Sequence, residues 1–358
     1  MITYLKKLDI ALLLPIGILS FISLVTIASV ASNLLVQQLI SFILGWLIIV
    51  AAAFFDVRPI FKQRFFVMGI YFLAVLLLLL TLLFAPTIRH TKSWIVIGPI
   101  QFQTSEFAKL VLVITLAYFF AKRHLAIAYA KNILIPLAYL SALLILILKQ
   151  PDLGSGLILI GLFIGFLFFS GLRPQHIAIG LALALFFSFW AWGNFLKPYQ
   201  KERIEALFYP DRDPLGINYN TIQSKIAIGS GGFFGKGFGQ GTQVQLKFLP
   251  EAQTDFIFSA IVEEWGLVGG LLVLGSFMAM MFRIAFIGIA MPDNFGKLVC
   301  LGTMIVFMLH FTFNIGSSLG LLPVVGVPFN FLSYGGSNLI MSFLLIGIIE
   351  SIALRSNF

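Results

Sequence analysis

The sequence has few charged residues, and acidic residues are the scarcest: 14 Asp and Glu stand against 23 Lys and Arg in 358 residues. Charged residues make up 10% of the chain, whereas an average soluble protein carries about 25%. Because 60% of the residues are hydrophobic, a soluble fold could not bury the apolar surface. The composition predicts a single integral membrane domain over residues 1–358.

The chain also lacks the residues of several common sites. Its one cysteine, Cys300, excludes an intrachain disulfide. Its four histidines, His90, His124, His176 and His310, are scattered without the spacing of zinc ligands. The net charge of +9 does not indicate a nucleic-acid partner, because the basic residues lie where the positive-inside rule places them.

Apolar runs of roughly 20 residues, the length that crosses a bilayer core, follow one another along the chain. We expect an all-α polytopic fold with about ten spans, the first of them uncleaved. The predicted spans are Asp9–Ala31, Leu35–Phe55, Phe65–Phe84, Ser105–Ala121, Asn132–Leu148, Leu153–Ser170, Gln175–Gly193, Phe256–Phe286, Phe295–Ser318 and Tyr334–Leu354.

The connections between spans fall alternately on the two sides of the membrane, and lysine and arginine are concentrated in one of these two sets. This asymmetry predicts the orientation. The short connections of the poorer set hold Arg89, Lys92 and Lys149. Both termini are therefore expected in the cytoplasm, and the long connection of about residues 194–255, between spans seven and eight, outside. The richer, cytoplasmic set contains Lys6, Lys7, Arg58, Lys62, Arg64, Lys122, Arg123, Lys131, Arg173, Arg283, Lys297 and Arg355.

The long outer connection mixes aromatic residues, glycines and both signs of charge, and so we expect it to be functional. Its segment GSGGFFGKGF resembles a phosphate-binding loop, but Ser230 and Gly237 stand where that motif needs glycine and Ser or Thr. We therefore expect no nucleotide site. Its apolar residues predict packing on the membrane domain: Phe208, Tyr209, Ile226, Ile228, Phe233, Phe234 and Phe238.

Acidic residues near an apolar span are candidate site residues, because burying a carboxylate in a membrane costs about 2.5–3.5 kcal/mol. Asp255 stands where the outer connection enters the eighth span, either as a helix cap or as a functional acid. Glu263 and Glu264 lie two turns deeper and suggest a polar pocket. Asp152, in QPDLGSG, is either an N-cap or part of the site. Glu350 is expected only to cap or snorkel.

Glu106 and Lys109 form a further candidate pair in QTSEFAKL. A spacing of three places both on one helical face, so they can neutralise each other as a structural ion pair. Alternatively, Lys109 faces a cavity and meets a phosphate as a point charge. The sequence leaves both interpretations open.

Four segments resemble the shape, elongation, division and sporulation (SEDS) family of bacterial peptidoglycan polymerases. They are SWIVIGPIQFQTSEFAKL, QPDLGSG, PVVGVPFNFLSYGGSNLI and the most specific, QSKIAIGSGGFFGKGFGQGTQVQLKFLPEAQTDFIFSAIVEEWGLVGG. They follow the family's order over nearly the whole chain. KIAIGSGGFFGKG and GTQ resemble the branch that acts in rod-shaped elongation rather than the division branch.

The resemblance implies a ten-span enzyme of the bacterial cytoplasmic membrane that joins units of lipid II, undecaprenyl-linked disaccharide-pentapeptide, through β-1,4 bonds during cell elongation. It implies a class B penicillin-binding protein as partner. The family's essential acid falls on Asp255 and its YGGS turn on 334–337. The residues expected at the substrate are Glu106, Lys109, Asp152, Trp94, Glu263, Ser333 and Tyr334.

Two positions depart from the family pattern. Ser93 precedes Trp94 where the family usually has arginine, and Thr104 stands where it usually has proline. Lys92 or Arg89 could supply the missing charge.

The expected reaction is attack by a sugar 4-hydroxyl on an anomeric carbon that carries a lipid pyrophosphate. Since an α-linked donor gives a β bond, the transfer inverts, and one carboxylate base, Asp255, suffices. Lys109, loop basic residues or a divalent cation, Mg²⁺ or Mn²⁺, would stabilise the leaving group. The alternatives are a lipid II flippase and a scaffold that organises partners.

Overall fold

The computed structural model describes residues 8–88, 91–98, 100–122, 131–169 and 218–355, with scattered positions between 189 and 216. Within these residues, seven helices are long and apolar enough to cross a membrane. They are α2 (Ile10–Val30), α3 (Leu35–Phe54), α5 (Arg64–Phe84), α6 (Thr104–Ala121), α13 (Ile257–Ala290), α14 (Asn294–Ser318) and α15 (Gly336–Ala353).

Two further apolar helices, α7 (Lys131–Lys149) and α8 (Leu153–Phe169), complete the set. Nine of the predicted spans thus coincide with a helix to within about a turn. The tenth, Gln175–Gly193, lies almost wholly outside the described residues. The polytopic helical fold is confirmed, and the count of ten stays a prediction. The shorter elements are η1 (Ser32–Leu34), α4 (Arg58–Lys62), α11 (Tyr219–Ser230), α12 (Thr242–Gln245), β1 (Trp94–Ile97) and β2 (Ile100–Gln103).

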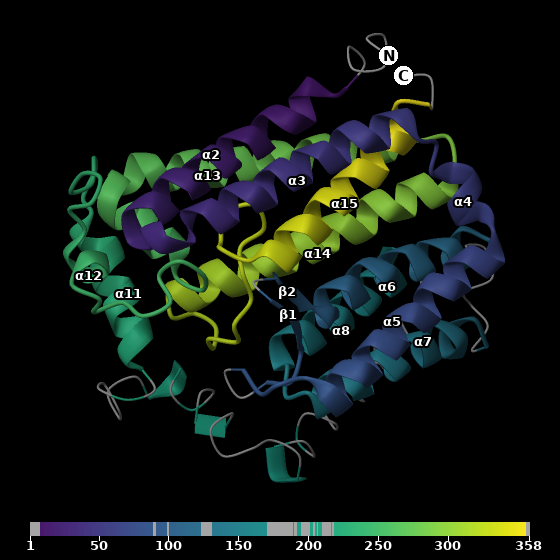
Figure 1. The fold of residues 1–358 in the computed structure, drawn as a ribbon, viewed down its shortest axis with the longest axis horizontal. Helices are drawn as coiled ribbons and strands as arrows, with labels where there is room; N and C mark the ends of the chain where they lie inside the picture. The colour runs from purple at the N-terminus through teal and green to yellow at the C-terminus, as the bar shows by residue number, and fades with distance from the viewer. Residues whose placement is uncertain are drawn as a thin grey trace.

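The long helices run side by side in one bundle (Figure 1). Helix α15 packs on α3, α13 packs on α2, and α6 lies between α5 and α14. Helices α6 and α15 are the most enclosed of the spans. Their polar residues are therefore surrounded by protein, whereas α2, α3 and α5 present apolar side chains outward.

The first and last described residues meet at one end of the bundle. Arg283 forms an ion pair with Asp9 at 2.7 Å, and the backbone N–H of Asp9 donates to the buried Glu350. The guanidinium of Arg58 donates to the Arg355 carbonyl. Three basic residues predicted on one side thus lie at one end, while α11 and α12 lie at the other (Figure 1). Which end faces the cytoplasm stays a prediction.

Helix α13 breaks at Gly266, where φ is 67° and ψ is −164°, a conformation that only glycine adopts readily. The break frees backbone groups that the outer connection then uses. The N–H groups of Leu267 and Val268 donate to the carbonyls of Gly232 and Phe233. On the other side of the break, Lys236 and Gly237 donate to the carbonyls at 263 and 264. The connection is therefore paired to the broken helix by backbone hydrogen bonds.

Glycine is required in this segment because the two backbones approach closely. A Cβ at Gly231 would lie 2.0 Å from the Val262 carbonyl oxygen, and one at Gly235 would lie 2.2 Å from that of Glu264. The glycines of GSGGFFGKGF thus allow packing against α13. This gives the motif a structural role in place of phosphate binding.

The outer connection packs on the membrane domain as predicted, but through other residues. Its buried apolar side chains are Ala227, Val244, Leu249 and Ala252. Most of the aromatic and aliphatic residues expected to make this contact are exposed instead: Phe208, Tyr209, Ile226, Phe233, Phe234 and Phe238. The reason is that backbone pairing, rather than side-chain burial, holds the glycine-rich part.

We predict that Gly235→Ala destabilises the protein by about 1–3 kcal/mol, because the new methyl group overlaps the α13 backbone and a φ of +80° disfavours alanine. Gly229→Ala is the control, since nothing lies within 4 Å of its Cβ position. Thermal unfolding in detergent measures both. Equal melting temperatures for the two variants would contradict the close packing.

Candidate functional site

Asp255 lies in a turn of residues 251–256, just before α13. The Glu251 carbonyl accepts hydrogen bonds from the N–H groups of Thr254, Asp255 and Phe256. The N-cap position of α13 belongs to Phe256, and no side chain caps the helix. The alternative that Asp255 is a helix cap is therefore wrong, and Asp255 precedes the helix rather than beginning it.

Three consecutive carbonyls of this turn are held by donors from distant segments. The Tyr334 N–H donates to the Gln253 carbonyl at 2.8 Å. The Ser333 hydroxyl donates to the Thr254 carbonyl at 2.6 Å, and the Asn314 amide donates to the carbonyl of Asp255 at 3.1 Å. We call these donors the carbonyl clamp. They fix the backbone on which the Asp255 carboxylate is carried.

Ser333 and Tyr334 are both anchored themselves. The Ser333 hydroxyl accepts the N–H of Phe329 at 2.9 Å, which orients its proton toward the turn. The Tyr334 hydroxyl donates to Gln37 Oε1 at 2.5 Å, and burial raises the pKa of this hydroxyl above its usual value near 10. The tyrosine is therefore a neutral donor at ordinary pH. Both predicted site residues lie beside the Asp255 turn.

Helix α14 links the turn to the membrane interior. Asn314 donates to the Val327 carbonyl, and His310, one turn away on the same face, contacts the Pro328 carbonyl through Nδ1 at 2.8 Å. Because a carbonyl only accepts, Nδ1 carries the proton. The sequence indicated no zinc-ligand role for His310 and did not single out Asn314.

His310 leads to the buried pair of Glu106 and Lys109. Lys109 Nζ lies 2.7 Å from Glu106 Oε1 and 2.9 Å from His310 Nε2. Since Nδ1 holds the imidazole proton, Nε2 accepts from the ammonium. The Asn338 amide donates to Glu106 Oε2 at 3.1 Å. The pair is 4–5% exposed, which favours the structural ion pair, while substrate binding by it stays a prediction.

Asp152 begins α8 and reaches the start of α6. Its Oδ1 accepts the N–H of Ser155 at 3.0 Å, so the N-cap interpretation is confirmed. Its Oδ2 accepts from Ser105 at 2.9 Å and from Gln103 at 3.2 Å. This capping carboxylate, which also orders the start of α6, stays a candidate for substrate binding.

Trp94 lies on a hairpin that sequence patterns did not predict. Strands β1 and β2 pair antiparallel, with Trp94 opposite Gln103. The hydroxyl of Ser337 accepts the Gln103 N–H and donates to the Gln101 carbonyl. The hairpin is thereby tied to the start of α15, and Trp94 is half-buried.

The structure gives a physical account of one departure from the family pattern. Thr104 is buried, and its hydroxyl lies 3.0 Å from the hydroxyl of Thr81 on α5. The Gln150 amide also donates to the Thr81 hydroxyl. Threonine thus joins α6 to its neighbours where proline would have no hydroxyl. Ser93 is also buried, and its carbonyl accepts the Thr104 N–H.

Glu263 and Glu264 bind the outer connection. Glu263 forms an ion pair with Lys236 at 2.7 Å and accepts the N–H of Gln243. Glu264 accepts from the Ser29 hydroxyl and from the N–H at position 239. The two carboxylates therefore hold the glycine-rich segment in place. Substrate binding by Glu263 stays a prediction.

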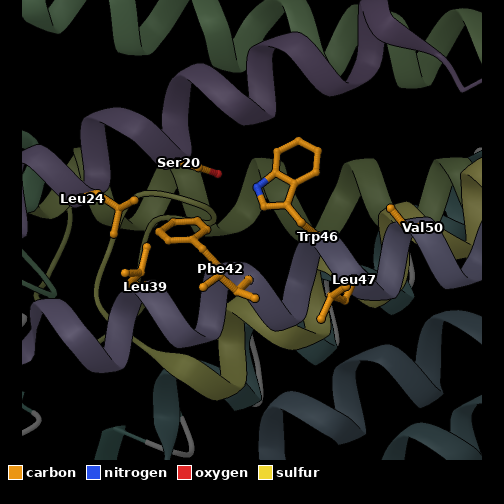
Figure 2. Close-up of a pocket in the computed structure, with 8 residues that line it drawn as sticks. Ser20, Leu24, Leu39, Phe42, Trp46, Leu47 and Val50 are labelled. Atoms are coloured by element: carbon orange, nitrogen blue, oxygen red, sulfur yellow. The ribbon is translucent and has the colours of Figure 1, made fainter. Parts of the chain in front are cut away.

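An apolar groove of about 350 Å³ opens between α2 and α3 (Figure 2). Gln38, which precedes the lining residue Leu39 in α3, donates to the Ser333 carbonyl at 3.3 Å. Helix α3 thus contributes to the groove and also contacts a residue of the carbonyl clamp. Its lining residues are Ser20, Leu24, Leu39, Phe42, Ile43, Trp46, Leu47 and Val50.

Within the described ranges, no group of three or more His, Cys, Asp or Glu side chains could hold a metal ion. The use of a divalent cation stays a prediction. The described site joins one acid on a fixed turn, hydroxyl and amide groups, and a buried ion pair.

The fold and this site define a class: polytopic helical membrane proteins whose polar site lies at one end of the bundle. The family model described as cell cycle protein, FtsW/RodA/SpoVE, matches residues 4–357. The chain belongs to this family, as the four resembling segments predicted.

Two of the relatives are named for the same activity. The peptidoglycan glycosyltransferase MrdB of Escherichia coli K12 is 39% identical over 79% of this chain and 76% of its own. The peptidoglycan glycosyltransferase RodA of Treponema pallidum is 30% identical over 98% and 97%.

Solved structures also match this chain. A chain from a study of polymerization and crosslinking by a peptidoglycan synthase complex matches with a TM-score of 0.83, 29% identity and 98% coverage of both chains. The rod shape determining protein RodA of Thermus thermophilus matches with a TM-score of 0.73, 27% identity and the same coverage.

We predict that Ser333→Ala slows polymer synthesis about 10- to 100-fold, because a small displacement of a reacting group costs that much. The buried Thr26→Ala is the control, since the Thr26 hydroxyl bonds to Ile22 in its own helix. Initial rates in proteoliposomes compare the two. A Ser333→Ala rate equal to that of Thr26→Ala would contradict the clamp.

A double substitution separates the two interpretations of the buried ion pair. Glu106→Gln alone leaves an uncompensated ammonium, and we predict a loss of stability of about 3–5 kcal/mol. Combining it with Lys109→Met should recover much of that loss. If the pair is structural, synthesis recovers with stability. A stable double variant without synthesis would instead assign a role at the substrate to the pair.

Proposed function

We propose that this protein is a peptidoglycan glycosyltransferase that polymerises lipid II through β-1,4 bonds, in the manner of the RodA branch that serves cell elongation. The observation that carries the proposal is the carbonyl clamp, which presents Asp255 on a fixed turn. The names of the relatives support the activity. The localisation follows: a bacterial cytoplasmic membrane, with both termini inside and the Asp255 turn outside.

In the proposed mechanism, Asp255 accepts the proton of the acceptor's sugar 4-hydroxyl as its oxygen bonds to the anomeric carbon of the donor. The bond from that carbon to the pyrophosphate breaks, and the electron pair leaves with the lipid pyrophosphate. General base catalysis is typically worth about 100- to 10,000-fold in rate. Because the α-linked donor gives a β product in one displacement, no covalent enzyme intermediate is needed.

The leaving pyrophosphate needs positive charge near it. The ammonium of Lys109 is neutralised by Glu106 in this conformation, so basic residues of the outer connection or a divalent cation are the better candidates. A cation would act as a Lewis acid on the phosphate oxygens. Synthesis that falls with chelator and returns with Mg²⁺ or Mn²⁺ would assign one.

The apolar groove supports a lipid-linked substrate. It lies between α2 and α3 (Figure 2), and Gln38, which precedes the lining residue Leu39 in α3, donates to the carbonyl of the clamp residue Ser333. We place the polyprenyl chain in this groove, because hydrocarbon fills an apolar channel without loss of hydrogen bonds. The sugar end of such a lipid then lies toward the Asp255 turn.

A class B penicillin-binding protein is the proposed partner, since glycan made here must be crosslinked. The structural match to a peptidoglycan synthase complex supports an assembly of this kind. A flippase remains the alternative function, because polar residues inside a helix bundle also occur in transporters.

The reconstituted protein, supplied with labelled lipid II and its partner, tests the proposal. We predict that Asp255→Asn lowers polymer synthesis at least about 100-fold, because an amide cannot accept the proton. Asp293→Asn is the control, since Asp293 caps α14 and asparagine caps equally well. Full synthesis by correctly inserted Asp255→Asn would refute the mechanism. Translocation by both proteins without polymer would establish the flippase.

A further inference from the structure

The glycine-rich segment exposes large apolar side chains that neither the site nor the proposed reaction uses. Phe233 is 59% exposed, Phe234 78%, Phe238 52% and Leu246 63%. We call these four residues the apolar patch. Phe233 and Phe234 contact each other edge to face, with ring centroids 4.9 Å apart. Exposed clusters of this kind mark interaction sites.

Hydrogen bonds fix the level of the apolar patch along the bundle. Glu264 accepts from Ser29, the penultimate residue of α2, and from the Gln245 amide beside Leu246. Helix α2 has 21 residues, and at about 1.5 Å per residue this matches the hydrocarbon thickness of about 30 Å. Glu264 and the segment bonded to it therefore lie at the outer edge of the hydrocarbon.

The patch is continuous with the lipid-facing surface of α13. The Val268 N–H donates to the Phe233 carbonyl at 3.2 Å, which places Phe233 beside the part of α13 after its break. There Leu267, Val268 and Leu271 are 45–55% exposed, as side chains that face lipid are. Trp265, also exposed, adjoins them at the level where aromatic residues prefer the membrane interface.

The charged residues near the apolar patch also fit a membrane interface. Lys247 follows Leu246 and is exposed, so its ammonium can reach lipid phosphates while its neighbour enters the acyl region. Carboxylates would be repelled there, and the nearby Glu263 and Glu264 are buried under the segment instead.

We infer that the apolar patch is an interfacial membrane anchor: Phe233, Phe234, Phe238 and Leu246 insert into the outer edge of the bilayer, and so hold the connection that leads to Asp255 against the lipid surface. The partner is the lipid bilayer itself. The inference does not depend on the proposed reaction.

Fluorescence quenching in nanodiscs tests the anchor, with the full chain and a Cys300→Ala background that removes its one cysteine. An environment-sensitive fluorophore is attached at Phe234→Cys, with Phe238→Cys as a second site. Leu271→Cys on α13 is the lipid-facing control, and Pro292→Cys, exposed between α13 and α14, is the aqueous control.

We expect nitroxide lipids labelled near the headgroup to quench position 234 more than lipids labelled near the bilayer centre, with the opposite order at Leu271. Aqueous iodide should quench 234 at least about threefold less than Pro292, because the interface excludes ions. Iodide quenching equal to that of Pro292, without lipid quenching, would overturn the inference. So would protection that appears only when a partner protein is added.

Discussion

The constraint on which the site depends is the capture of three consecutive backbone carbonyls. A turn at the mouth of a membrane helix has no intrinsic reason to keep one conformation, since its carbonyls can all bond to water. Here Tyr334, Ser333 and Asn314 take the carbonyls of residues 253–255 in order. Each donor comes from a segment about 60–80 residues further along the chain. The direction of the Asp255 carboxylate therefore depends on the packing of α14 and of the loop before α15.

Helix α14 extends this order into the bundle. Its residues Asn314 and His310 hold the carbonyls of Val327 and Pro328, and His310 also accepts from Lys109 on α6. A buried ion pair is costly unless its remaining polar atoms are satisfied. The histidine and Asn338 meet that condition. The same polar residues thus stabilise α6 and fix the loop that supplies the clamp.

The sequence was sufficient to predict the described membrane helices, because hydropathy over 20 residues identifies a span whichever helices it packs against. It was insufficient to predict contacts between backbone groups that lie far apart in the sequence. Gly266 lies two residues after Glu264 in a run that reads as one continuous span, and hydropathy carries no information on backbone angles, so the break in α13 was not predicted. The sequence excluded a phosphate-binding loop at the glycines around 231 and 235, but it did not show that they pack closely against α13.

The candidate acids show the same division. Resemblance selected Asp255, and residue spacing correctly paired Glu106 with Lys109. Neither could find Asn314, because its role rests on a contact with a carbonyl 59 positions earlier. The one available signal was the asparagine itself: a polar side chain within an apolar span, with no evident role in its own helix. The prediction that the phenylalanines of the outer connection pack on the membrane domain was wrong for a related reason. Membrane proteins expose apolar side chains on their surface, so an apolar residue need not be buried in protein.

Amide hydrogen exchange across residues 251–256 tests the clamp most directly, because it reports on the turn without requiring catalysis. In wild-type protein the Asp255 and Phe256 amides, which bond to Glu251, should be protected. Ser333→Ala should accelerate their exchange and leave the centre of α14 unchanged. Unaltered exchange in this turn, in a variant that has lost synthesis, would contradict the account and assign Ser333 to the substrate instead.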